Sequence, residues 1–133
     1  MVRIRNAYSG FAVKDLDAAR DFYRGKLGLE VSDEEMGTLG LHLPGGARVV
    51  VYAKEDHVPA VFTILNLAVD DIESAVDDLT AAGVAMERYE GQGFQADAKG
   101  IVRDERGPAI AWFTDPSGNI ISVLQEQPAR VAG

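Results

Sequence analysis

The feature that most constrains the fold is an internal repeat. The segment FAVKDLDAARDFYRGKLGLEV (11–31) aligns with LAVDDIESAVDDLTAAGVAME (67–87) at an offset of 56. Farther along, LHLPGGARVVVYAK (41–54) aligns with FTDPSGNIISVLQE (113–126) at an offset of 72, so the second copy is longer by 16 residues. Self-similarity of this kind indicates that one supersecondary unit is built twice.

Both copies carry the same local signals. An apolar run leads into an aspartate, Asp15 or Asp71, whose carboxylate can accept hydrogen bonds from the free N–H groups of a first helical turn. Apolar residues then recur at helical spacing up to a glycine typical of a helix end, Gly28 or Gly83, and these two glycines align after a gap of one residue. The expected strands are 7–13, 29–32, 37–43 and 47–53 in the first copy and 61–69, 84–89, 109–114 and 119–125 in the second. Each copy therefore reads as a strand, a helix and three strands.

The two modules are expected at about 5–56 and 60–127, within a single domain that covers residues 1–133. A chain of this length can bury one ordinary core without a disulfide or a metal. The additional residues of the second module lie around 89–108. A glycine-bearing segment of that length is interpreted either as a lid or as a solvent-exposed excursion.

Composition excludes several functions. The chain has no cysteine, which removes disulfides, thiolate metal sites and a thiol nucleophile. Its longest apolar runs, such as VVVYA (49–53), are too short to cross a bilayer, so a cytoplasmic protein with no membrane partner is expected. The net charge of −8 argues against nucleic-acid binding and weakly favours a cationic small molecule.

Alternation along the expected strands separates two faces of each sheet. Phe11 and Val13 are expected to cover the helix of their module, while small and polar residues face the other way. The same rule places His42, Trp112 and Thr114 on the face away from the helices. That concave face is where a ligand would bind.

The three repeated segments resemble the βαβββ modules of the vicinal oxygen chelate superfamily, which includes glyoxalase I, extradiol dioxygenases and bleomycin resistance proteins. The resemblance spans about residues 5–126, and Phe22-Tyr23 followed by Leu27-Gly28 strengthens it. It implies an α+β fold in which two tandem βαβββ modules form a curved, barrel-like mixed sheet with the helices outside. It also implies a homodimer.

In metal-using members of this family, the resemblance implies four ligands drawn from His, Gln and Glu on the concave face. The matching positions here hold Tyr8, Val50, Ile64 and Ser122. Neutral hydroxyls are poor ligands for a divalent ion, and Val and Ile have no donor atom. We therefore expect no metal and no cofactor, and a serine, Ser122, where metal-binding members carry Glu.

The leading hypothesis is a metal-independent protein that binds a small aromatic or cationic molecule, for example to sequester an antibiotic or an aromatic metabolite. Trp112, the only tryptophan, offers an aromatic face, and the other candidates offer aromatic or hydrogen-bonding groups. The candidate ligand-binding residues are Tyr8, His42, Tyr52, Thr63, Asn66, Phe94, Trp112, Thr114 and Ser122.

Two other functions stay open on the sequence. One is a glyoxalase- or dioxygenase-like enzyme with an unusual metal site, or a metal-free isomerase using His42 or Tyr8, so no catalytic residue is assigned. The other is a partner module whose concave face is filled by apolar side chains such as Val50, Ile64 and Ile120. Fold alone does not decide among these functions.

Overall fold

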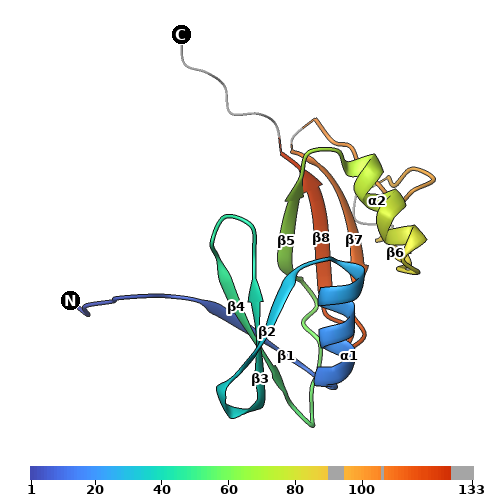
Figure 1. The fold of residues 1–133 in the computed structure, drawn as a ribbon. Coiled ribbons are helices and arrows are strands. Elements are labelled where there is room, and N and C mark those ends of the chain that lie inside the picture. Colours follow the sequence, from blue (N-terminus) through green and yellow to red (C-terminus); the bar gives the residue numbers. More distant parts are fainter. Residues whose placement is uncertain (90–94, 106, 127–133) are drawn as a thin grey trace. The chain divides into compact units, whose positions relative to one another are not determined.

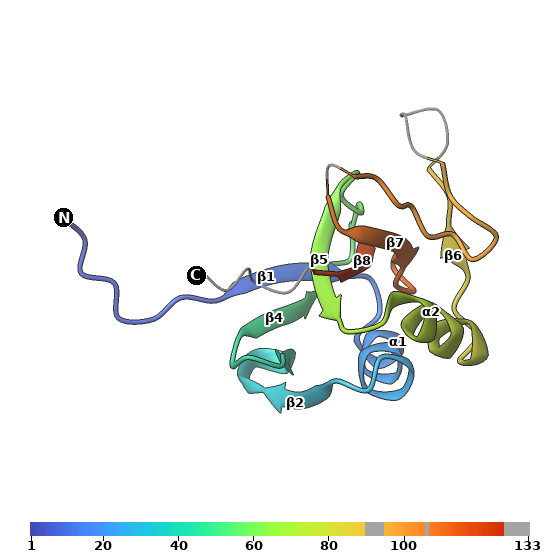
Figure 2. The same cartoon turned by 90° about the horizontal axis from the view of Figure 1, so that it is seen from above.

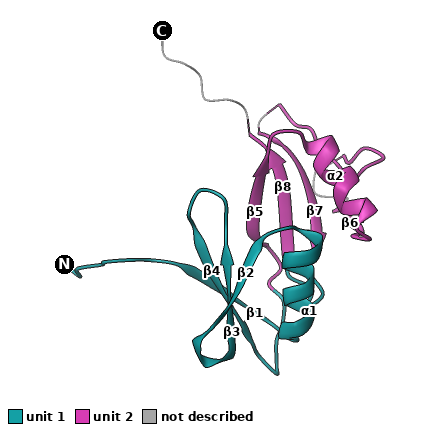
Figure 3. Ribbon diagram, viewed as in Figure 1, with its two compact units in different colours: residues 1–59, 115–119 teal, residues 60–114, 120–133 magenta. Residues whose placement is uncertain are grey.

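A computed structural model describes residues 1–89, 95–105 and 107–126. The chain forms two compact units, residues 1–59 with 115–119 and residues 60–114 with 120–133 (Figure 3). The elements occur along the chain in the predicted order, strand, helix and three strands, twice (Figure 1). The predicted α+β fold of two tandem βαβββ modules is confirmed.

Unit 1 is a four-stranded sheet with one helical segment. Its strands are β1 (Ser9–Val13), β2 (Glu30–Glu34), β3 (Thr38–His42) and β4 (Arg48–Ala53), in the order β1-β4-β3-β2, with β1 parallel to β4. The helical segment is α1 (Leu16–Arg20) continued by η1 (Asp21–Lys26), and a short 3₁₀ turn, η2 (Glu35–Gly37), links β2 to β3. Phe22 and Tyr23 are buried with Leu39, Leu41 and Val51 from the sheet.

Unit 2 has the same arrangement. Its elements are β5 (Thr63–Val69), α2 (Ile72–Ala81), β6 (Met86–Glu87), β7 (Ala109–Thr114) and β8 (Ile120–Gln125), and the sheet order is β5-β8-β7-β6. Ile72, Val76 and Leu79 of α2 are buried, as are Phe113 and Ile121 of the sheet. Figure 2 shows α2 lying beside this sheet. In the described part of the chain, no helix has the length and apolar character needed to span a membrane.

The one-residue gap in the repeat has a structural cause. η1 is a π-helix, in which Leu27 N–H donates to the carbonyl of Phe22 five residues earlier at 3.1 Å. A π turn takes up one residue more than an α turn, so the helical segment between Asp15 and Gly28 is longer by one residue than that between Asp71 and Gly83. Gly28 and Gly83 end the helices at positive φ, 70° and 88°, as predicted.

The predicted strand over 84–89 is shorter in the structure because another segment takes its place. β6 pairs with Phe113 and Trp112 only, and Ile110, two residues before Trp112 in β7, exchanges backbone hydrogen bonds of 2.8 and 3.0 Å with Val102. Ile101 and Val102 are buried. Part of the segment that we interpreted as a lid or an excursion therefore completes the edge and core of the second sheet. Residues 90–94 and 106 of that segment lie outside the described residues.

The turn DPSGN (115–119) belongs to unit 1. Asp115 is buried and accepts hydrogen bonds from the Tyr23 hydroxyl at 2.7 Å and from the backbone N–H groups of Ser117 and Asn119, both at 2.9 Å. Asn119 Nδ2 donates to the Ala12 carbonyl at 2.8 Å. Burial, and Asp115 beside it, raise the pKa of the Tyr23 hydroxyl, which therefore stays a protonated donor. The turn therefore links β1 and η1 through these hydrogen bonds.

The predicted helix caps are confirmed, and their contribution to the free energy of unfolding can be measured. Asp71 Oδ1 accepts from the backbone N–H groups of Glu73 at 3.1 Å and Ser74 at 3.3 Å. We expect Asp71→Ala to lower the free energy of unfolding at neutral pH, as measured by urea denaturation, because the N–H groups of the first turn lose their acceptor. The hydrogen bonds from Ser74 lower the pKa of Asp71 in the folded protein. The cap therefore contributes its full stabilisation at pH values above the pKa that Asp71 has in the unfolded chain. The difference between wild type and variant should shrink as the pH falls from about 4 through that lowered pKa, and a pH-independent difference would contradict the assignment.

Candidate ligand-binding site

The face of unit 2 that points away from α2, called here the open face of unit 2, carries the polar candidates. Register pairs Asn66 with Ser122 and Ser122 with Trp112, so the three side chains share one row across the sheet. The next row pairs Thr63 with Ile120 and Ile120 with Thr114.

Strict alternation would put Thr63 on the same side as Leu65, against the core. A β-bulge between Thr63 and Leu65 shifts the register by one residue, which brings Thr63 onto the open face of unit 2. The sequence signals no bulge at this position. The bulge explains how Thr63 comes to lie beside Trp112.

Ser122 is the serine within the apolar run of β8. Its side chain is fully buried, at 0% exposure, and its hydroxyl donates to Asn66 Oδ1 at 2.6 Å. Asn66 is exposed, and its amide carries two N–H donors besides the oxygen that Ser122 holds. Ser122 therefore orients Asn66.

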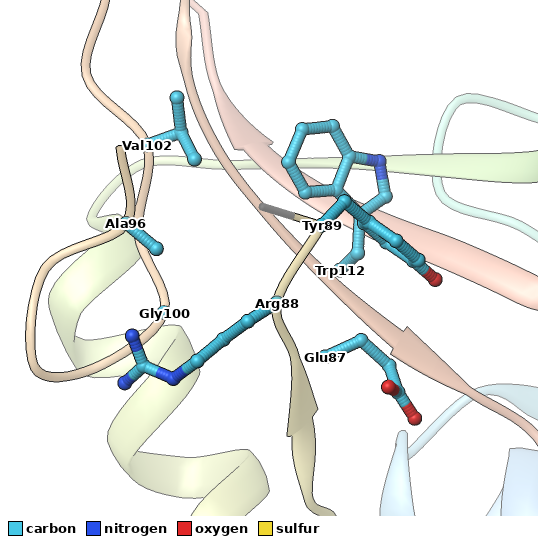
Figure 4. A pocket seen from close by; sticks show the side chains of 7 residues that line it. All are labelled: Glu87, Arg88, Tyr89, Ala96, Gly100, Val102 and Trp112. Atoms are coloured by element: carbon cyan, nitrogen blue, oxygen red, sulfur yellow. The ribbon is translucent and has the colours of Figure 1, made fainter. Parts of the chain in front are cut away.

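Trp112 is held from two sides. Its indole N–H donates to Thr63 Oγ1 at 3.2 Å, and the Tyr89 ring packs edge-on against it with ring centroids 5.6 Å apart at 77°. Glu87 and Tyr89 extend to one side of their segment and Arg88 to the other (Figure 4). Burial, with Glu87 as a smaller cause, raises the pKa of the Tyr89 hydroxyl.

The space next to these rings is narrow. Trp112, Tyr89, Glu87 and Val102 line it together with Arg88, Ala96 and Gly100. It leaves no room for a water molecule between its walls. A ligand on unit 2 would therefore lie over the open face beside Trp112, with Tyr89 as a wall.

Unit 1 has a corresponding open face, the side of its sheet away from α1 and η1. His42 pairs with Arg48 in one row, Gly40 with Val50 and Gly10 in the next, and Tyr52 with Ala12 in the third. Tyr8 lies just before β1, since the predicted strand 7–13 begins only at Ser9, and its side chain is 64% exposed. Tyr52 is 43% exposed.

A chain of hydrogen bonds crosses this face. The Ser32 hydroxyl lies 2.9 Å from Glu34 Oε1 and 2.7 Å from His42 Nε2, and Arg48 is ion-paired with Glu34. The Ser32 hydroxyl therefore links the Glu34 carboxylate to the His42 ring across the open face of unit 1.

The structure therefore brings five of the predicted residues onto one face of unit 2: Thr63, Asn66, Trp112, Thr114 and Ser122. His42 and Tyr52 lie on the open face of unit 1, with Tyr8 next to it. Phe94 lies outside the described residues. Sequence reasoning missed Tyr89, although its two-residue spacing from Glu87 signals a shared face. It also missed the Ser32–Glu34–Arg48 chain, in which Ser32 and Glu34 have the same two-residue spacing but Arg48 lies on another strand.

The family's metal site does not fit this chain. Of the four matching side chains, Val50 and Ile64 have no donor atom, and the hydroxyl of Ser122 is buried and committed to Asn66. The remaining one, Tyr8, supplies a neutral phenol. Among residues 1–89, 95–105 and 107–126, no three His, Asp or Glu side chains gather to hold an ion.

The fold and the repeated modules define the class of protein. The chain belongs to the Glyoxalase/Bleomycin resistance protein/Dioxygenase superfamily, whose sequence profile matches residues 6–123. Comparison with curated proteins finds no match.

Solved structures of this class have the same fold at low identity. TnmS3, an antibiotic binding protein from Streptomyces sp. CB03234, is 23% identical with a TM-score of 0.66, over 95% of this chain and 100% of that one. FosX, a fosfomycin resistance protein from Listeria monocytogenes, is 11% identical with a TM-score of 0.68, over 95% of this chain and 96% of that one. A superfamily member from Sphaerobacter thermophilus is 23% identical with a TM-score of 0.65, over 92% of this chain and 98% of that one.

Proposed function

We propose that this protein binds a small, partly aromatic or cationic organic molecule on the open face of unit 2 without the help of a divalent metal. The observation that carries the proposal is the pair of preset groups in one row of the sheet: the Trp112 indole, held by Thr63, and the Asn66 amide, held by Ser122. Groups that are already oriented lose little freedom when a ligand arrives. Trp112 supplies a stacking face, and Asn66 supplies amide N–H donors.

The comparisons support a binding role. TnmS3 is an antibiotic binding protein, and FosX is a fosfomycin resistance protein. By analogy of fold, the present chain is proposed to sequester an antibiotic or an aromatic metabolite. Tyr8, His42 and Tyr52 are proposed to offer aromatic and hydrogen-bonding groups on unit 1 itself. The functional form is proposed to be a homodimer, which light scattering tests directly.

The proposal predicts that Trp112 dominates affinity. A screen of planar aromatic and quaternary ammonium compounds by thermal shift should find molecules that raise the melting temperature, because a ligand specific for the folded state stabilises it. For such a compound, Trp112→Ala should weaken binding by about 30-fold or more, measured by calorimetry, as for a central aromatic contact.

Two further variants control this test. Trp112→Phe keeps an aromatic ring and should retain most of the affinity. This variant shows whether Trp112→Ala binds weakly because a stacking surface is lost or because the protein no longer folds. Phe62→Ala removes another aromatic side chain of unit 2, one that is 66% exposed, and should have no effect. Unchanged binding in Trp112→Ala would contradict the proposed site.

A further inference from the structure

The open face of unit 1 carries a charged group, Arg48, that the proposed function does not use. Arg48 begins β4 and pairs in register with His42 of β3. Its guanidinium is ion-paired with Glu34, and the Arg48 side chain is 45% exposed. A guanidinium has five N–H donors, and Nη2 of Arg48 makes the hydrogen bond to Glu34 Oε1.

Glu34 is able to hold Arg48 because of a glycine. A Cβ added at Gly40 would lie 2.6 Å from Glu34 Oε1 and 2.9 Å from Ser32 Oγ. The missing side chain lets the Glu34 carboxylate fold over the sheet, where Ser32 donates to the same oxygen that Arg48 approaches. Arg48 is thereby restrained by a carboxylate that is itself anchored, so a ligand meets a guanidinium with reduced rotamer freedom.

A groove runs beside Arg48 within unit 1. It is formed by residues at the start of β4 and in the segment that leads into β1, and its volume is about 410 Å³. That volume suits a small organic molecule. The groove is lined by Asn6, Tyr8, Ser9, Gly46, Arg48 and Val49, together with two alanines.

The lining chemistry selects one class of ligand. Arg48 is the single charged side chain among these residues, and Tyr8, Asn6 and Ser9 add polar groups that can donate hydrogen bonds. An arginine fork matches a carboxylate with two parallel N–H···O bonds. The exposed Tyr8 ring beside it offers a surface for an aromatic ring.

We propose that this groove binds the carboxylate end of a small aromatic acid, with Arg48 as the group that recognises the charge and Glu34, Ser32 and Gly40 as the groups that position Arg48. This site goes beyond the proposed function, because it takes an anionic ligand on unit 1 and does not involve Trp112. Binding should weaken as salt is added, since the guanidinium is partly exposed.

The test compares 4-hydroxybenzoate with 4-hydroxybenzamide, which share a ring and differ in charge. Each is titrated into the ¹⁵N-labelled full chain, and the backbone amide signals of Gly46 and Val49 report on the groove while the indole N–H signal of Trp112 reports on unit 2. We expect the acid to shift the groove signals saturably and the amide to bind about tenfold more weakly, the loss of one charge-assisted contact. Arg48→Met should abolish the preference for the acid.

Lys26→Met is the matched control, because it removes one positive charge from an exposed position at the end of η1 and should leave the preference intact. Equal affinity for the acid and the amide, a preference that survives Arg48→Met, or groove signals that do not move would each overturn the proposal. The Trp112 signal distinguishes binding on unit 2 from binding in the groove of unit 1. An acid that shifts only that signal overturns the Arg48 site while leaving the unit 2 proposal standing.

Discussion

Asp115→Ala is expected to lower the free energy of unfolding by about 3–5 kcal/mol, a third or more of the stability of an ordinary domain. Asp115 is 4% exposed, and its carboxylate accepts four hydrogen bonds, from the Tyr23 hydroxyl, the Asn119 side chain and two backbone N–H groups of its own turn. Alanine would leave all of these donors without their acceptor. The Tyr23 hydroxyl is the most costly, because it lies at 0% exposure where no water reaches it.

Two milder variants show whether unsatisfied donors are the cause. Tyr23→Phe removes the buried donor together with its need for a partner, and Asp115 keeps three other hydrogen bonds, so a loss of about 1–1.5 kcal/mol is expected. Asp115→Asn retains an oxygen acceptor and should fall between the two. Urea denaturation followed by circular dichroism measures all three, and a Tyr23→Phe variant as unstable as Asp115→Ala would show that packing, not the hydrogen-bond network, dominates.

The repeat explains why so much of the fold could be predicted. Asp15 and Asp71 cap their helices, and Gly28 and Gly83 end them at positive φ, because these are local requirements of the backbone that particular residue types meet. Strand β7 has the predicted bounds, and the other long strands differ by one or two residues at their ends. Aligning two copies of the same unit reinforces each local signal.

What could not be predicted depends on contacts between distant residues. The side chains of Tyr23 and Asp115 are hydrogen-bonded although they are 92 residues apart in the sequence. No periodicity in the sequence predicts that a turn of the second module belongs to unit 1. The bulge that turns Thr63 onto the open face and the fold of Glu34 over Gly40 are also set by packing. The sequence therefore predicted which residues belong to the candidate site. The hydrogen-bond partners that orient those residues became known only from the structure.

The two open faces differ in chemistry, which bears on function. In unit 2, Trp112 and Asn66 are preset by neutral partners, Thr63 and Ser122. In unit 1, the groups are charged, with Arg48 held by Glu34. The duplication preserved the backbone and its caps while the side chains of the two open faces diverged, as is common when function is carried by sites placed on a shared fold.

The second large effect concerns the position where metal-binding relatives carry a carboxylate. Ser122→Glu is expected to lower the free energy of unfolding by about 3–5 kcal/mol, because it puts an unpaired carboxylate at a fully buried position. Its neighbours in the row, Asn66 and Trp112, carry no charge to compensate it. Protonation of the new carboxyl group would relieve part of this cost.

Metal ions should not rescue the Ser122→Glu variant, because Tyr8, Val50 and Ile64 add no ligand stronger than a neutral phenol. A divalent ion bound with a micromolar dissociation constant would add about 4.1 kcal/mol at a millimolar concentration. Thermal unfolding with and without 1 mM Mn²⁺ or Zn²⁺, roughly a thousandfold above such a constant, distinguishes the cases. Ser122→Ala, which loses only the hydrogen bond to Asn66, should cost about 1 kcal/mol and serves as the control. A melting temperature that rises with metal in wild type would refute metal-independent binding, and a rise in Ser122→Glu alone would show that the neighbouring side chains can complete a metal site.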